Sequence, residues 1–335
     1  MSARGTVQTI ARSGSYATAG DRLSIFLRRV GPIWSAVLVL YVVAGIKEPA
    51  MLQTSQLFNI LQVAAFLGCI AIGQTIALLV GGIDLSVAGV VTLTNIVVAR
   101  LMAGSSDRIV QAVGACLILA IVVGLINGFV ITKLGITPLI VTLATNSILF
   151  GAALVYTHGA PSGSVAEPFA QLGQGHISRF PVSTLVWIGL TCLMAFVLTQ
   201  TVFGRRLYAV GANPNAARLM GVPTDRTITS AYVLCSLMAC AGGLLITAYI
   251  GLPSLGIGNQ FMLTSIAAAV VGGTMLTGGV GSVIGAAGGA LFIQVLNSFT
   301  NMLTDSTGVQ FIIQGIIIAL GVMLYPALSG RSGRR

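Results

Sequence analysis

The chain has 335 residues, of which 56% are hydrophobic and only 7% are charged, and its mean hydropathy is +0.98. A soluble domain carries about 25% charged residues, so this composition excludes a protein with a mainly water-facing surface. The net charge of +10 does not indicate nucleic-acid binding, because the basic residues flank hydrophobic runs as they do in oriented membrane proteins. We expect an all-α polytopic membrane protein, since each span in lipid must satisfy its own backbone hydrogen bonds.

Ten hydrophobic segments follow one another along the chain. A helix needs about 20 predominantly apolar residues to cross the hydrocarbon core of a bilayer. The candidates are 30–46, 57–80, 86–103, 109–131, 136–157, 184–202, 228–250, 261–278, 281–303 and 308–327. The eighth and ninth are separated only by a Gly-rich turn, so either one is a candidate for a re-entrant segment. The sequence therefore predicts about ten transmembrane helices within a domain of residues 30–328.

Basic residues orient these helices. A polar tail, residues 1–29, precedes the first segment and lacks the pattern of a cleaved signal peptide. A second basic tail, residues 329–335, follows the last segment. With ten crossings, both tails share one side of the membrane with Lys133 and the loop 203–227, and that side carries 13 of the 17 lysines and arginines. Excess positive charge marks the cytoplasmic side, so we expect both termini to be cytoplasmic and the first tail to be disordered.

The longest expected outside loop, residues 158–183, contains both histidines of the chain, His158 and His176. Their separation does not match the spacing of metal ligands. The five cysteines lie within apolar runs and show no paired spacing. We therefore expect no metal site, no disulfide and no cofactor bound by this chain.

The expected cytoplasmic loop 203–227 encodes a short helix. Asn213 is a favourable N-cap, Pro214 suits the first helical position, and Gly221 suits the position after the C-cap. Three apolar residues share one face of this helix at i, i+3, i+4 spacing: Ala216, Leu219 and Met220. Such a face has two interpretations, which are packing on the membrane or the protein's own bundle and docking into a groove on a partner.

One acidic residue, Asp84, lies deep in an apolar stretch, where ionisable groups are costly. It follows Gly81 and Gly82, so it is either a group for proton or ion coupling or the cap of a helix that begins near residue 86. The cap is the favoured interpretation, because no second buried acid or membrane histidine is available as a relay partner.

A related break is predicted at Gly272 and Gly273. Residues 268–277 match residues 77–86 at five of ten positions, including the shared Val-Gly-Gly. Gly-interrupted helices at corresponding positions of two halves flank the pathway in many transporters. The repeat is therefore a hypothesis for two equivalent helix breaks, although short Gly-rich matches also arise by chance in apolar sequence.

Uncharged polar residues recur within the expected helices. Each of them is compatible with a helix–helix contact, and together they suit a pathway for a neutral polyol, whose hydroxyls pair with amides and hydroxyls. The candidate pathway residues are Asn95, Thr142, Asn146 and Asn297.

The sequence contains no G-x-x-x-x-G-K-[ST] phosphate loop, and its only lysines are Lys47 and Lys133. Any ATP that drives transport must therefore be hydrolysed by a separate subunit. No arrangement of nucleophile, base or metal ligands is present either, so the chain is expected to be a transporter subunit rather than an enzyme.

Three segments taken together resemble the permease subunits of the ribose/xylose/arabinose/galactose class of bacterial ABC sugar importers. They are 74–95 (QTIALLVGGIDLSVAGVVTLTN), 127–157 (NGFVITKLGITPLIVTLATNSILFGAALVYT) and the run from Phe203 to Tyr325 with FGRRLYAVGANPNAARLMGVPTDR and IAAAVVGGTMLTGGVGSVIGA. The resemblance covers roughly residues 55–327.

The resemblance implies an ABC importer permease fold in the bacterial inner membrane. It also implies partners: a second permease copy, identical or different, separate ABC ATPase subunits and a periplasmic or secreted sugar-binding protein. The loop 203–227 is then the coupling loop that contacts the ATPase. The residues that the resemblance assigns to this contact are Gly211, Asn213, Ala216, Leu219, Met220 and Gly221.

Three alternatives remain open from sequence. A permease for nucleosides or branched-chain amino acids has the same broad architecture. A proton- or sodium-coupled secondary transporter would depend on Asp84 as its buried ionisable group. A passive channel would conduct without any nucleotide.

Overall fold

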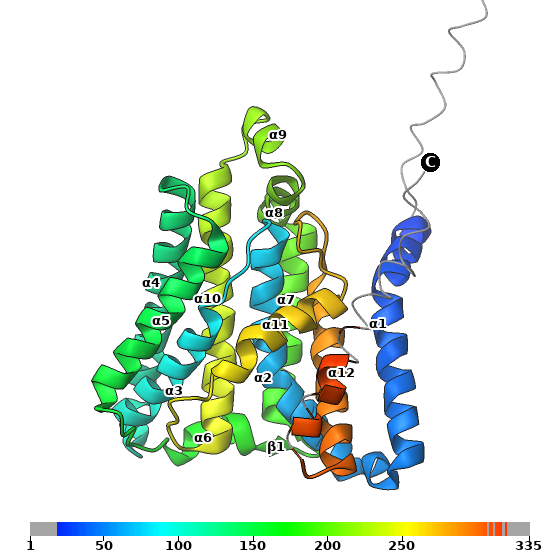
Figure 1. Cartoon of the computed structure of the whole chain (residues 1–335), viewed down its shortest axis with the longest axis vertical. Coiled ribbons are helices and arrows are strands. Elements are labelled where there is room, and N and C mark those ends of the chain that lie inside the picture. Colours follow the sequence, from blue (N-terminus) through cyan, green and yellow to red (C-terminus); the bar gives the residue numbers. More distant parts are fainter. Residues whose placement is uncertain (1–18, 307, 311, 317–318, 320–335) are drawn as a thin grey trace, which may run out of the picture.

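The computed structural model describes residues 19–306, 308–310, 312–316 and 319. These residues form a helical bundle with one small antiparallel strand pair (Figure 1). The helices are α1 Ala19–Lys47, α2 Thr54–Leu79, α3 Val87–Met102, α4 Ile109–Lys133, α5 Pro138–Thr157, α6 Glu167–Gln174, α7 Val182–Gln200, α8 Val202–Ala212, α9 Pro214–Leu219, α10 Thr224–Ile250, α11 Asn259–Val271 and α12 Val283–Leu303, and the strands are β1 His176–Ile177 and β2 Phe180–Pro181. The strand pair is a departure from the all-α expectation.

Nine of the ten predicted segments coincide with helices in the described part of the chain. The tenth, 308–327, and the tail 329–335 fall largely or wholly outside the described residues. Six described helices are long and apolar enough to cross a membrane: α2, α4, α5, α7, α10 and α12. The apolar parts of α1, α3 and α11 are shorter. At 1.5 Å per residue, α3 and α11 rise about 24 Å and about 20 Å, less than the roughly 30 Å of a hydrocarbon core.

Helix α1 begins at Ala19, eleven residues before the start expected from hydropathy. The expected tail 1–29 is thus helical from residue 19 onwards, and residues 1–18 lie outside the described part. Hydropathy marked only the apolar part of this helix, which the structure bounds at Gly31–Lys47, because residues 19–29 include four charged positions. Charged residues do not prevent helix formation, and no helix-disfavouring proline or glycine lies between residues 21 and 30.

Helix α2 forms the centre of the bundle, and nearly every side chain from Ile60 to Val80 is buried. It packs against α7, α10, α11 and α12. Helix α4 packs against α10 through small residues, because a Cβ at Gly124 or Gly128 would overlap the backbone of α10. By contrast, α4, α5 and α7 each expose a row of large apolar side chains. Helix α1 exposes a similar row, which includes Leu38, Val39 and Ile46, so these four helices contribute much of the apolar outer surface of the described bundle.

The expected loop 203–227 contains a helix that sequence reasoning did not predict. Helix α8 starts directly after α7, and the Thr201 hydroxyl caps it by accepting a hydrogen bond from Gly204 N at 3.3 Å. The sequence did contain a signal for this helix: a threonine that can cap it, followed by a run without proline as far as Asn213. We assigned this run to a loop because it contains the charged Arg205 and Arg206. Figure 1 places α8 directly beneath α9, at the end of the bundle opposite α6 and β1.

Candidate coupling surface and helix breaks

Helix α9 projects from one end of the bundle as a defined knob (Figure 1). The Asn213 side chain caps its start by accepting a hydrogen bond from Ala216 N at 3.0 Å. Its end is a Schellman motif, in which Gly221 N donates to Arg218 O and Val222 N donates to Ala217 O, both at 3.0 Å. Gly221 has φ +79°, a conformation that glycine adopts without strain. Capping hydrogen bonds thus fix both the start and the end of this short helix.

The tip of α9 is apolar and uncovered. Leu219 is 88% exposed and Met220 is 85% exposed, and Ala216 is exposed beside them. An unbroken apolar tip on a capped helix is the geometry that helix-in-groove recognition uses. The opposite side of α9 is anchored by Ala217, which is buried.

An ionic cluster ties α9 to the bundle. Arg218 donates to Asp225 Oδ1 at 3.1 Å and to Thr224 Oγ1 at 3.1 Å. Lys133, the last residue of α4, bonds the other oxygen of Asp225 at 2.8 Å. Exposed ion pairs contribute about 0.2–1 kcal/mol each, so their main effect here is to set the direction in which α9 points.

Two helix breaks lie under α8. The first separates α2 from α3 and contains Gly81, Gly82 and Asp84, and the second separates α11 from α12 and contains Gly272 and Gly273. Gly81 and Gly273 have φ +79° and +92°, so both chains turn through backbone that glycine adopts readily. A Cβ at Gly82 would overlap the Tyr232 hydroxyl, and one at Gly272 would overlap Gly285 O.

Asp84 is fully buried in the first break. Its Oδ1 accepts from Ser86 N at 2.9 Å and from Ser86 Oγ at 2.5 Å, directly before α3 begins. The Gln74 side-chain amide faces the backbone of Asp84, and the hydrogen-bonding groups there assign its orientation: the nitrogen donates to Asp84 O at 3.0 Å and the oxygen accepts from Asp84 N at 3.2 Å. Oδ2 has no hydrogen-bond partner, and the salt bridges among the described residues all involve Asp225 instead.

A chain of hydrogen bonds links this break to neighbouring helices. Thr145 Oγ1 on α5 donates to Asn127 Oδ1 at 2.7 Å, and Asn127 Nδ2 on α4 donates to Ser86 Oγ at 2.9 Å. Thr142 on α5 accepts from Leu85 N at 3.1 Å. The first break is therefore fixed to α4 and α5 as well as to α2. Hydropathy alone gave no signal for Asn127 as a partner of Ser86, or for Thr145 as a partner of Asn127.

The four candidate pathway residues occupy different environments. Asn95 on α3 is fully buried, and its amide bonds to Thr247 Oγ1, Leu252 O and Ser254 N, all on α10 or just beyond it. Thr142 is also fully buried at the first break. Asn146 and Asn297 are partly exposed, on α5 and α12. No hydrogen bond joins any two of these four described side chains, and only Asn146 and Asn297 have partly exposed side chains.

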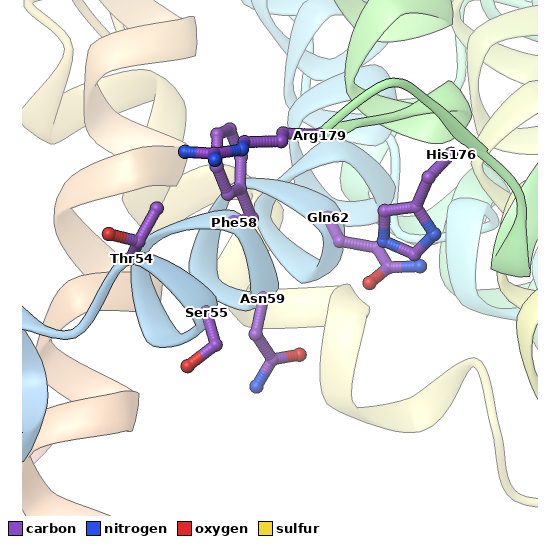
Figure 2. A pocket seen from close by; sticks show the side chains of 7 residues that line it. All are labelled: Thr54, Ser55, Phe58, Asn59, Gln62, His176 and Arg179. Atoms are coloured by element: carbon purple, nitrogen blue, oxygen red, sulfur yellow. The ribbon is translucent and has the colours of Figure 1, made fainter.

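A polar hollow of about 410 Å³ opens at the end of the bundle opposite α9. Figure 2 shows its lining, which the first turns of α2 and the turn between β1 and β2 supply: Thr54, Ser55, Phe58, Asn59, Gln62, His176 and Arg179. Gln62 is nearly buried and donates to Gly173 O at 2.6 Å, which ties α2 to α6. Sequence reasoning treated His176 as an isolated surface histidine, because only the β1–β2 turn brings it to α2.

Long apolar helices, two short helices with glycine breaks and an exposed apolar knob, α9, together define an integral, multi-pass membrane protein of the permease class. The family described as "Branched-chain amino acid transport system / permease component" matches residues 56–322, and the chain belongs to this family. No solved structure matches the chain significantly.

Curated relatives cover almost the whole chain. The ribose import permease protein RbsC of Bacillus subtilis (strain 168) is 34% identical, covering 89% of this chain and 92% of its own length. The probable ABC transporter permease protein y4mJ of Sinorhizobium fredii (strain NBRC 101917 / NGR234) is 36% identical over 97% of both chains. The galactose/methyl galactoside import permease protein MglC of Escherichia coli (strain K12) is 31% identical, covering 88% of this chain and 93% of its own length. These relatives confirm the family resemblance drawn from the three sequence segments.

Proposed function

We propose that this chain is the transmembrane permease subunit of an ATP-binding-cassette importer in the bacterial inner membrane. The observation that carries the proposal is α9, a doubly capped helix whose tip exposes Leu219 and Met220 to 88% and 85%. Apolar side chains so exposed on a basic, water-facing end suit a groove on a partner. The partner is a separate ATPase subunit, because this sequence has no phosphate loop of its own.

The proposed substrate is a monosaccharide of the pentose or hexose class, delivered by a secreted binding protein. Two relatives are named for ribose and for galactose or methyl galactoside import. The family description names branched-chain amino acids instead. Amino acids carry a carboxylate and an ammonium group, whereas the partly exposed pathway candidates, Asn146 and Asn297, are neutral amides that suit hydroxyl groups. Uptake of labelled ribose or galactose, compared with leucine and a nucleoside, distinguishes these substrates.

In this scheme the α9 end of the bundle faces the cytoplasm together with both termini, and about ten helices cross the membrane. The polar hollow at the opposite end faces the binding protein. Its exposed amide and hydroxyl groups, those of Asn59, Thr54 and Ser55, suit a solute that is rich in hydroxyls. A second permease copy completes the pathway, and closure of the ATPase subunits displaces α9.

Purification of the tagged protein from native membranes tests the central claim. We expect a stoichiometric subunit that contains a phosphate-loop lysine. Leu219→Asp places a charge in the proposed groove and lowers recovery of that subunit at least about tenfold, as loss of an interface hot spot does. Ile177→Asp is the matched control, because it places the same charge on an exposed apolar residue at the opposite end, where Ile177 is 62% exposed. We expect it to leave recovery of the ATPase subunit unchanged.

The proposal is wrong if the parent chain is recovered without any such subunit, or if Leu219→Asp co-purifies with it as the parent does. In the first case an ion-coupled secondary transporter becomes the leading function, and Asp84 becomes its first candidate residue.

A further inference from the structure

We infer that three glycines, Gly211, Gly278 and Gly279, are positioning residues that transmit movement of α8 and α9 to both helix breaks. With Leu79 and Gly81 they form a side-chain-free contact, which we call the glycine joint. The inference rests on the proposed function, because it assigns a route from the ATPase contact to the transport pathway.

The first contact joins α8 to the end of α2. A Cβ added at Gly211 would overlap Leu79 O, the last carbonyl of α2, and would lie 2.5 Å from Gly279 N. Gly279 N itself donates to Leu79 O at 3.0 Å. Three segments that are distant in sequence therefore meet backbone to backbone at one carbonyl.

The second contact joins the two breaks to each other and to α8. A Cβ at Gly278 would lie 2.9 Å from Gly81 N and 3.0 Å from Gly211 O. One at Gly279 would lie 2.8 Å from the Cα of Ala212. Real Cβ atoms do not approach backbone this closely, so only glycine permits the observed packing at these positions.

The joint lies between the coupling knob and the buried polar groups. Asn213, the cap of α9, follows α8 directly, and Figure 1 shows α8 between α9 and the end of α2. Tyr208 on α8 also donates to Gly281 O at 3.0 Å in the second break. On the other side of the joint, Gly81 precedes Asp84 by three residues.

Backbone contacts of this kind transmit displacement efficiently. A close-packed interface has no flexible side chain that absorbs a shift of a few tenths of an ångström, so rigid elements must move together or separate. If α8 moves when α9 is pushed, both breaks move with it. The glycine joint thereby links both helix breaks, which share the Val-Gly-Gly pattern, to one movement, that of α8.

The test uses the complete transporter, with ATPase and binding protein, in proteoliposomes. The measured quantity is the ratio of sugar imported to ATP hydrolysed. Gly279→Ala is expected to lower this ratio at least about fivefold, the lower end of typical coupling effects, while recovery of the ATPase subunit stays as in the parent. Gly211→Ala is expected to lower the ratio by a similar factor, whatever its effect on that recovery. Gly114→Ala and Gly189→Ala are matched controls, since a Cβ at either helical position meets nothing within 4 Å.

Two further variants keep the test decisive. Gly279→Asn tolerates positive φ, so a lowered ratio in this variant reflects the contact with Ala212 rather than backbone strain. Gly278→Ala combines a milder overlap with a left-handed φ of +86°, so its ratio is compared with that of Gly279→Asn. It serves if Gly211→Ala does not fold, as judged by thermal unfolding in detergent.

A merely structural role would lower protein yield and both rates together, leaving the ratio unchanged. An unchanged ratio in folded Gly279→Asn and Gly278→Ala, with the ATPase subunit still bound, overturns the joint and leaves the proposed function intact. Loss of the ATPase subunit from the parent protein would instead overturn the proposed function.

Discussion

Asp84 is a buried acid that holds the turn directly before α3, whose N-cap residue is Ser86. One carboxyl oxygen bonds Ser86 N and Oγ, its backbone is clamped by Gln74, and its other oxygen has no partner. A buried carboxylate without a cation is costly, so the site gains little from a negative charge. The geometry therefore favours the helix-cap interpretation over ion coupling.

Substitution of Asp84 separates these two roles. Asp84→Asn retains an oxygen that accepts from Ser86, and we expect it to fold and to transport sugar until ATP is depleted. Asp84→Ala removes the acceptor and is expected to lower the free energy of unfolding by about 1 kcal/mol, the usual cost of a lost cap. Thermal unfolding in detergent and ATP-dependent uptake provide the measurements. Loss of transport in a stable Asp84→Asn protein would favour an ion-coupled mechanism.

The sequence predicted residues whose partners lie a few positions away, but it did not predict the roles of residues whose partners lie far away along the chain. Asn213 and Gly221 were predicted as helix ends from spacing alone, because capping depends on neighbours a few positions away. Gln74, Asn127 and Gly278 gave no comparable signal. Their roles depend on partners 10, 41 and 197 residues away in sequence, namely Asp84, Ser86 and Gly81.

At the scale of elements, α9 depends on the conformation of its last residues. Gly221 has φ +79°, and a Cβ at this position would meet nothing within 4 Å, so substitution there changes backbone preference rather than packing. Gly221→Val places a β-branched residue in left-handed backbone at a cost of about 1–2 kcal/mol. The Schellman bonds of Gly221 and Val222 then weaken, and α9 loses its fixed direction.

We expect Gly221→Val to abolish sugar uptake while the melting temperature of the bundle changes little. Gly221→Asn, which tolerates positive φ, is expected to retain most uptake and serves as the control. Uptake into proteoliposomes and thermal unfolding of the same preparations are the two measurements. Normal uptake by Gly221→Val would show that the shape of α9 does not matter for transport.

Hydropathy located the hydrophobic elements but not their lengths. Hydropathy marked 261–278 as one apolar segment, whereas α11 ends at Val271, directly before the break that the Val-Gly-Gly match predicts at Gly272 and Gly273. Residues 272–278 are apolar enough to read as helix, yet Gly273 and Gly278 adopt positive φ and turn the chain. Backbone conformation at glycine is decided by close contacts with other segments, and hydropathy does not record such contacts.

At the scale of the whole molecule, the two ends of the bundle carry different amounts of positive charge. The α9 end has Lys133 with four arginines: Arg205, Arg206, Arg218 and Arg226. Lys47, Arg100, Arg108 and Arg179 are the basic residues at the ends of α1, α3 and the outer segments. Arg22, Arg28 and Arg29 lie in the first part of α1, at the opposite end of this helix from Lys47, and Figure 1 shows that part of α1 toward the α9 end. The described basic residues therefore favour the α9 end by eight to four, and the orientation that this excess predicts can be tested directly.

Cysteine labelling tests which end of the bundle faces the cytoplasm. Cys192 is exposed and the other four cysteines are buried, so Cys192→Ser gives a background with little reactivity. In that background we expect a membrane-impermeant maleimide to label Ile177→Cys in intact spheroplasts and Leu219→Cys only in inverted vesicles. Both positions are well exposed, at 62% and 88%, so access to the reagent rather than burial decides the result. The reverse pattern would place α9 outside the cell, where no ATPase subunit could reach it.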